Sequence, residues 1–151
     1  MSAASTIDNV GFFDRLAELM NGDPERYRLV GDANMALVIV MHRAEGDFCV
    51  RLDFDGICCD GVAEIDAADV ARADFALVGE IADWQAMFDD IATNGRATGL
   101  QTINSLALLG DHIACEGADP MGLDKFSRFN QTIQQFLDGS AQLALAAGQP
   151  S

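Results

Sequence analysis

Apolar side chains recur at two spacings along this chain, and the change from one spacing to the other marks helices and strands. Between residues 9 and 20 they recur every three or four positions, which predicts a helix with one buried stripe. Asp23 followed by Pro24 is typical of the cap and first turn of a second, short helix that runs toward Gly31. Residues 35–41 are wholly apolar, and a run of this length predicts a strand covered on both faces.

Residues 48–55 alternate between apolar and polar side chains, as in a strand with one face on the core and the other in water. The pair Asp55-Gly56 then predicts a tight hairpin turn. On the return strand we expect the buried face to continue through four apolar positions, which are Ile57, Cys59, Ala63 and Ile65. Together with residues 35–41, these segments predict three antiparallel strands joined as a meander.

The second half of the chain alternates short strands with helices. A connector of small and acidic residues leads into a strand at 75–79, and a helix follows over residues 83–94. Thr98, with Gln101 three residues later, fits a capping box for another helix that is apolar for most of its length and that Gly110 ends.

A brief strand at 112–116 and a last helix complete the predicted order. Asp119-Pro120 begins this helix, and Gly139 ends it. The tail that follows has no comparable pattern, so we expect residues 140–151 to fray. With half of its 151 residues apolar, the chain is long enough for one compact domain with a sizeable core, which we assign to residues 1–139.

The order of these elements resembles the sterol carrier protein type 2 family. The segment ADFALVGEIADWQAMF is similar to the family's junction between the fourth strand and a helix with a conspicuous Trp or Leu after an acidic residue, and GDHIACEG is similar to its glycine-flanked last strand. The resemblance implies an α/β domain of the α+β type. Its five-stranded, mixed but largely antiparallel sheet would have helices on one face, closing an apolar tunnel. The segment MGLDKFSRFN departs from the family's shorter link into the last helix.

Charge and cysteine content exclude several classes of protein. The net charge of −15 disfavours nucleic acids and anionic membranes as partners, because phosphate contacts need basic side chains. The N-terminal segment lacks the pattern of a signal peptide, and no run is long enough to span a bilayer, so we expect a soluble, cytoplasmic protein without stable membrane insertion. The four cysteines have no C-x-x-C spacing, which favours reduced core residues and no metal site or cofactor.

No catalytic motif stands out, so the sequence favours a non-enzymatic protein that binds or carries a hydrophobic small molecule such as a fatty acyl chain or sterol. Ordinary core packing accounts for the same apolar residues. Two alternatives stay open. One is a small α+β isomerase or hydrolase with an Asp and His42 in its pocket, and the other is a protein-interaction domain, with a homodimer or a partner enzyme as the possible assembly. The residues expected to line the tunnel are Met87, Ile91, Leu100, Ile103, Phe126, Phe129 and Ile133.

Overall fold

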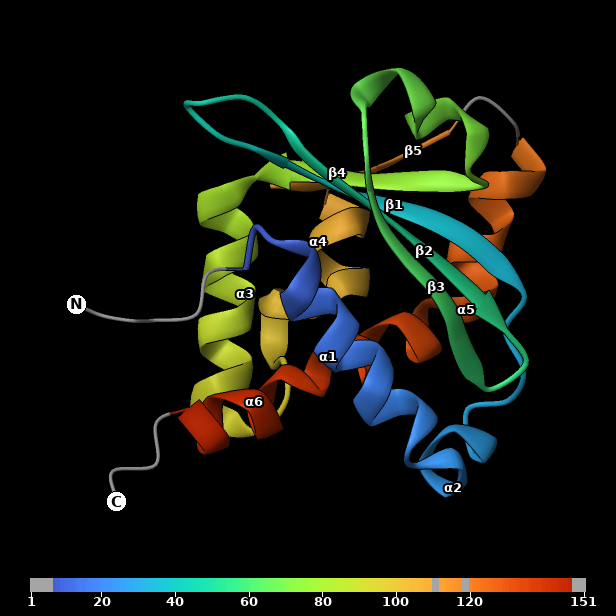
Figure 1. The fold of residues 1–151 in the computed structure, drawn as a ribbon, viewed down its shortest axis with the longest axis vertical. Helices are drawn as coiled ribbons and strands as arrows, with labels where there is room; N and C mark the ends of the chain where they lie inside the picture. Colours follow the sequence, from blue (N-terminus) through green and yellow to red (C-terminus); the bar gives the residue numbers. More distant parts are fainter. Residues whose placement is uncertain (1–6, 110–111, 118–119, 148–151) are drawn as a thin grey trace.

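Five strands form one open, mixed sheet in the order β3-β2-β1-β4-β5 (Figure 1). The computed structural model describes residues 7–109, 112–117 and 120–147. The strands are β1 (Met35–His42), β2 (Phe48–Asp55), β3 (Cys58–Ile65), β4 (Phe75–Glu80) and β5 (Ile113–Glu116). The pair β1–β4 is parallel, whereas β1–β2, β2–β3 and β4–β5 are antiparallel. This arrangement confirms the predicted α+β fold.

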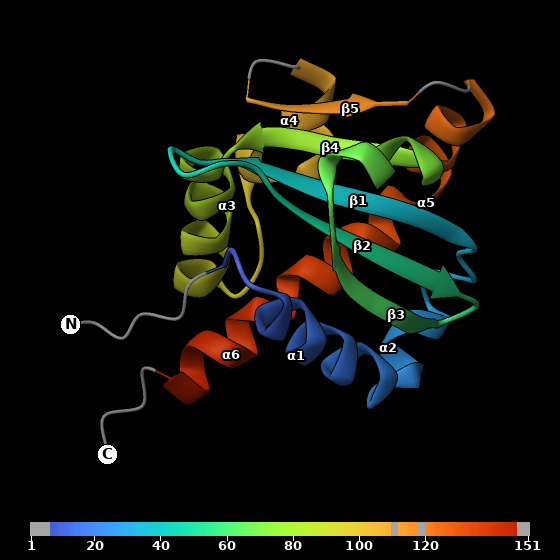
Figure 2. The ribbon, with the colours of Figure 1, turned by 45° about the horizontal axis from the view of Figure 1, so that its top comes forward.

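The longer helices cover one face of this sheet, and a short 3-10 helix lies on the other (Figures 1 and 2). The covering helices are α1 (Val10–Asn21), α3 (Ile81–Asn94), α4 (Ile103–Leu109), α5 (Pro120–Asp138) and α6 (Ser140–Ala147), and the small α2 (Pro24–Arg28) follows α1. The 3-10 helix on the opposite face is η1 (Ala67–Arg72), and a second one, η2 (Gly99–Gln101), precedes α4.

Strand β1 is buried on both faces, as its unbroken apolar run predicts. Its helix-facing side chains are Leu37, Ile39 and Met41, which belong to the main core. Its other side chains, Val38 and Val40, form a second, smaller apolar cluster with Cys49 and Ala76. Val70 of η1 packs against this cluster, so the connector between β3 and β4 covers part of the outer face. The outer face of β2, which the sequence predicts to be in water, is therefore exposed to solvent only in part.

A β-bulge changes which side of β3 faces the helices. The pairing of β2 with β3 shifts between Asp53 and Phe54, so that β3 carries one extra residue at that point. Cys59 lies in the main core as predicted. The prediction is wrong for Ala63 and Ile65, because a one-residue shift turns every later side chain to the opposite face.

Helix α4 begins later than its predicted capping box. Its first turn is capped by Thr102, whose Oγ1 accepts a hydrogen bond from Ser105 N at 3.2 Å. Thr98 has another role, because its Oγ1 donates to Asp90 on α3 at 3.0 Å. The capping box at Thr98 is therefore wrong, and a 3-10 turn fills the interval before Ile103.

The segment after Gly139 forms helix α6, although the sequence predicts a frayed tail. Ser140 and Ala141 are buried, and Leu143 packs against the main core. The helix lies beside α3. The small residues of α6 allow this close approach. Helix α6 has little amphipathic pattern, so its order comes from tertiary packing. The prediction for residues 148–151 lies outside the described part of the chain.

Candidate functional site

An apolar layer lies between the sheet and helices α3, α4 and α5, and most of the predicted lining residues belong to it. The buried ones are Met87 and Ile91 of α3, Ile103 of α4, and Phe126 and Ile133 of α5, all in the main core. Phe129 is partly buried and packs at the margin of the same core. The side chain of Leu100 lies outside the described part of the structure. We call this region the helix-side layer.

Aromatic contacts fix α5 on the sheet. The ring of Phe126 meets Phe75 of β4 edge-on, with centroids 5.8 Å apart, and Phe136 meets Phe54 of β2 in the same way at 5.2 Å. Phe129, one turn after Phe126, instead lies under the guanidinium group of Arg128, 5.2 Å from the ring centroid. Helix α5 is therefore anchored by Phe126 and Phe136, whereas the ring of Phe129 lies at the border between the layer and solvent.

A small polar cluster borders the helix-side layer at the C-terminal end of α5. Gln134 Oε1 accepts a hydrogen bond from Ile103 N at 2.7 Å, and Gln134 Nε2 donates to Asp138 Oδ1 at 2.8 Å. Asp138 Oδ1 also accepts from Ala97 N at 3.1 Å. These bonds tie the start of α4 and the chain before η2 to α5. Burial raises the pKa of Asp138 above its ordinary value of 3.8, since a low-dielectric site disfavours the charged form.

Asp138→Asn is expected to gain stability relative to the unchanged protein as the pH rises from about 4 to 7. A carboxyl whose pKa is raised by folding holds its proton more tightly in the folded state, so the folded state loses stability as the pH rises through the folded pKa. Asn keeps an oxygen for Ala97 N and cannot ionise. Urea unfolding of both proteins at several pH values measures the difference in free energy.

Asp90→Asn is the control for this experiment. Hydrogen bonds from Thr98 lower the pKa of Asp90, so its ionised form favours the folded state and that contribution is lost as the pH falls. This change falls below about pH 4, so the stability difference for Asp90→Asn should stay nearly constant from about pH 4 to 7 and change below pH 4 in the opposite direction to that for Asp138→Asn. A difference for Asp138→Asn that stays constant from about pH 4 to 7 contradicts the burial of an ionising carboxyl.

His42, the titratable residue of the enzyme alternative, lies apart from the helix-side layer. His42 Nδ1 is 2.8 Å from Asp47 Oδ1 near the turn between β1 and β2, and this hydrogen bond raises the pKa of His42. Arg43 pairs with Asp8 at 3.1 Å. The enzyme alternative places an Asp and His42 in a pocket, whereas His42 and Asp47 lie at an exposed turn. Within the described residues, no group of three or more His, Cys, Asp or Glu side chains is placed to hold a metal ion.

All four cysteines are free thiols, as the sequence predicts. Burial raises the pKa of Cys59 to about 12 and that of Cys115 to about 11. Burial also raises the pKa of Cys49 above its usual value. These thiols stay protonated at neutral pH, and a protonated thiol is a poor nucleophile and metal ligand.

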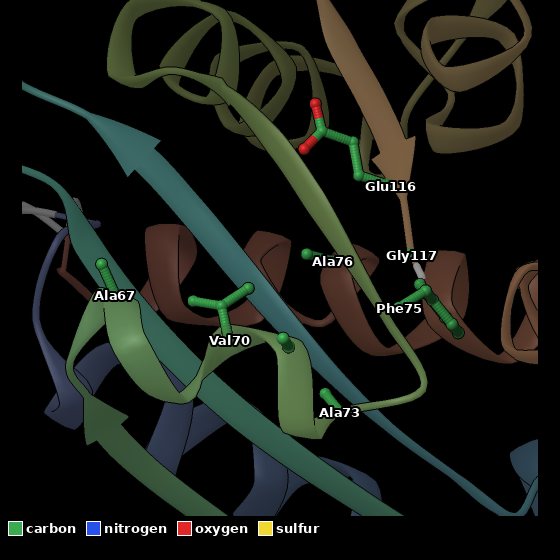
Figure 3. Close-up of a pocket in the computed structure, with 8 residues that line it drawn as sticks. Ala67, Val70, Ala73, Phe75, Ala76, Glu116 and Gly117 are labelled. Atoms are coloured by element: carbon green, nitrogen blue, oxygen red, sulfur yellow. The ribbon is translucent and has the colours of Figure 1, made fainter. Parts of the chain in front are cut away.

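A pocket that the sequence does not predict lies on the other face of the sheet, between η1 and the strands β4 and β5 (Figure 3). It has a volume of about 380 Å³. Its lining residues include Ala67, Val70 and Ala73 from the η1 segment, Ala76 of β4, Glu116 of β5 and Gly117. The available signal was the run of small residues at 66–73, which the periodicity marks only as a connector. We call this the outer pocket.

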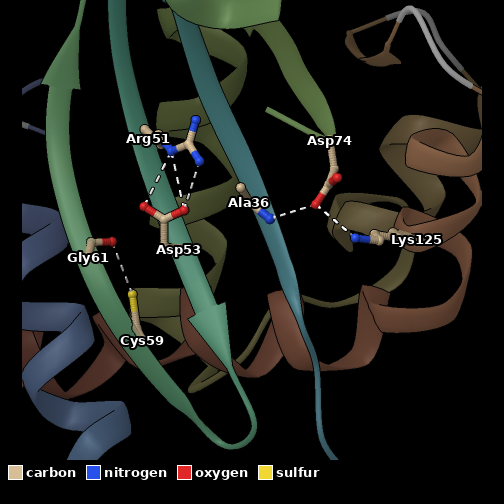
Figure 4. Close-up of polar contacts among 7 residues, drawn as sticks. All are labelled: Ala36, Arg51, Asp53, Cys59, Gly61, Asp74 and Lys125. Atoms are coloured by element: carbon tan, nitrogen blue, oxygen red, sulfur yellow. Dashed lines mark hydrogen bonds and ion pairs between the residues drawn. The ribbon is translucent and has the colours of Figure 1, made fainter. Parts of the chain in front are cut away.

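Asp74, next to the outer pocket, joins β1, β4 and α5 (Figure 4). Its backbone N donates to Ala36 O at 2.8 Å, and its Oδ2 accepts from Ala36 N at 2.8 Å. Lys125 Nζ of α5 lies 3.2 Å from the same Oδ2. Gly122 of α5 packs so closely on the carbonyl oxygen of Asp74 that a Cβ there would overlap it. The start of β4 is thus held in place from both sides.

The arrangement of sheet and helices is shared with solved structures. One match is the solution structure of a conserved hypothetical protein from Thermus thermophilus, described as possibly a sterol carrier protein. It has a TM-score of 0.68 and 15% identity and covers 94% of this chain and 92% of that chain. A crystal structure of sterol carrier protein 2 matches with a TM-score of 0.66 and 17% identity, over 90% of this chain and 98% of that chain.

The chain has the sterol carrier protein fold. The sequence prediction of this fold is confirmed by the structural matches alone. No family model matches the sequence, and no curated protein matches it significantly. Among the described residues of this sterol carrier protein fold, no helix combines the length and the apolar character that a membrane span requires.

Proposed function

We propose that this protein binds a hydrophobic small molecule, such as a fatty acyl chain or a sterol, in the helix-side layer. The main support is the fold, which this chain shares over at least nine-tenths of its length with a protein named sterol carrier protein 2. Most of the sequence-predicted lining residues lie in or at the margin of this layer, which further supports the proposal. Cytoplasmic location, and assembly as a homodimer or with a partner enzyme, stay predictions from the sequence.

The energetics allow such binding. Removing about twelve methylene groups from water at roughly 0.8 kcal/mol each contributes about 10 kcal/mol, and association costs at least about 4 kcal/mol. The difference of about 6 kcal/mol corresponds to a dissociation constant of some tens of micromolar. This balance allows an apolar chain to bind without any charged partner, which agrees with the apolar composition of the helix-side layer.

Side chains that can move make it easier for an apolar chain to enter this layer. Met87 is suited to this, since an unbranched thioether adapts to irregular neighbours. Phe129 is the side chain that bridges the layer and the solvent, because it packs on the core and is still partly exposed. Helix α4 has only seven residues, so few contacts oppose its displacement from α5. We infer that the ligand enters between α4 and α5, past Phe129.

Phe129→Asp is expected to weaken the binding of a fluorescent fatty acid at least tenfold, because a carboxylate at the margin of the layer opposes burial of an apolar chain. Phe129 is only partly buried, so the protein should still fold. The measurement is a titration of the full chain with an anthroyloxy-labelled fatty acid, after organic extraction to remove any lipid carried through purification.

Leu29→Asp is the matched control, because Leu29 of the loop after α2 is 90% exposed and lies outside the core. It introduces the same charge and should leave probe binding unchanged. If both variants fold and both bind the probe as the unchanged protein does, the ligand does not occupy the helix-side layer near Phe129, and the proposal fails.

A further inference from the structure

We propose that the outer pocket is a second binding site, separate from the helix-side layer, and that it takes a small apolar molecule carrying a positively charged amine. Three observations carry this proposal. The pocket has an apolar floor and wall, it is separated from the helix-side layer by the sheet itself, and the charged side chain that lines it is a carboxylate.

The floor and wall of the outer pocket are made of small apolar side chains. Ala76 of β4 is 4% exposed and belongs to the outer apolar cluster, and Val70 and Ala73 pack against that cluster from the η1 segment. Alanine leaves room where a larger residue would fill the gap between η1 and β4 (Figure 3). A ligand seated there covers apolar surface on both sides, which is the main driving force for binding at such sites.

The backbone of the sheet separates the two sites. Along β4, Leu77 belongs to the main core and Ala76 to the outer cluster, and Phe75 of the main core also contributes to the lining of the outer pocket. Neighbouring side chains of a strand lie on opposite faces, so β1 and β4 lie between most of the outer pocket and the helix-side layer. The proposal for the outer pocket can therefore be tested separately from the function proposed above.

Charge at the outer pocket selects a cation. Glu116 at the end of β5 lines it, and no basic side chain does among the lining residues that the structure describes. Lys125, on the nearby α5, is already paired with Asp74 at 3.2 Å, and Arg72 of η1 is paired with Asp69 at 3.6 Å. The whole chain has a net charge of −15, which adds a long-range preference for cations.

The volume limits the size of the ligand. At about 380 Å³ the outer pocket lies near the lower end of the range of small-molecule sites, which is roughly 300 to 1,000 Å³. A two-ring aromatic amine is of a suitable size, whereas a sterol or a long acyl chain is too large. The ligand class for this site is therefore a compact, apolar amine.

Three naphthalene probes of one size test the proposal: 1-naphthylmethylamine, the neutral 1-methylnaphthalene and the anionic 1-naphthylacetate. Titration of the full ¹⁵N-labelled chain by NMR should show the amine binding most tightly and the carboxylate least tightly. The amide shifts should concentrate in η1, β4 and β5. Equal affinity of all three probes, or shifts confined to α3 and α5, overturns the proposal.

Two variants separate the contributions of charge and space. Glu116→Gln should weaken binding of the amine by about three- to fivefold, the range for an exposed ion pair, and leave the neutral probe unaffected. Ala73→Leu should weaken both probes, because the added side chain occupies the pocket. Glu45→Gln, in the turn between β1 and β2, is the charge-matched control and should change neither affinity.

The fatty-acid titration distinguishes this site from the helix-side layer. Glu116→Gln and Ala73→Leu should leave fatty-acid binding unchanged, and Phe129→Asp should leave amine binding unchanged. If Ala73→Leu abolishes fatty-acid binding in a folded protein, the two sites are one and the proposal of a separate amine site is wrong. If fatty-acid binding is absent altogether, the amine titration still decides this proposal.

Discussion

Trp84→Ala is expected to lower the free energy of unfolding by about 3 to 5 kcal/mol, the usual cost of truncating a fully buried aromatic side chain. Trp84 of α3 is 0% exposed, and its Nε1 donates a hydrogen bond to Val40 O of β1 at 3.1 Å. The indole therefore joins the first helix after β4 to the central strand of the sheet. Its removal leaves a cavity under β1 and also removes the donor for a buried carbonyl.

Trp84→Phe separates these two effects. It keeps most of the apolar volume and removes the donor, so we expect a loss of about 1 to 3 kcal/mol. Urea unfolding followed by far-ultraviolet circular dichroism measures both variants, because Trp84 is the one tryptophan of the chain and its fluorescence is lost in each. If Trp84→Ala costs no more than Trp84→Phe, the volume of the indole contributes nothing and the expectation is wrong.

The strands could be predicted because the local pattern of apolar and polar residues indicates which faces are buried. The unbroken apolar run of β1 predicts two covered faces, and Val38 and Val40 are indeed covered on the face opposite Leu37 and Ile39. The bulge next to Asp53 could not be predicted in this way, since nothing in the alternating pattern marks which residue is left unpaired. Helix α6 was missed for a related reason, because its order comes from packing beside α3 and its own periodicity is weak.

The candidate site could be predicted in its apolar part. Spacing on α5 marks Phe126 and Ile133 as inward-facing, and both are buried in the helix-side layer. Gln134 and Asp138 were missed, because polar residues on an amphipathic helix ordinarily face water, whereas here they bond to Ile103 N and Ala97 N. The outer pocket depends on how η1 sits over β4, which is a tertiary arrangement without a periodic signal.

Gly122→Ala is expected to lower the free energy of unfolding by about 1 to 3 kcal/mol or more, as other overpacked contacts do. The added Cβ would overlap the carbonyl oxygen of Asp74, which is backbone and cannot rotate away. Asp74 itself is held by its two hydrogen bonds with Ala36, so the strain falls on α5. In an open helix position the same change stabilises, by up to about 1 kcal/mol.

Gly11→Ala provides a milder comparison, because a Cβ at Gly11 of α1 meets only side-chain atoms, which can shift, the nearest being the capping oxygen of Asn9 at 3.1 Å. Displacement of α5 by Gly122→Ala also moves Phe126 and Phe129 relative to the sheet, so the affinity for the labelled fatty acid should fall while the amine of the outer pocket still binds. Thermal unfolding and the two titrations test this together. Equal melting temperatures for the two alanine variants would mean that α5 is free to move away from Asp74, and the close contact at Gly122 would then have no part in positioning the helix-side layer.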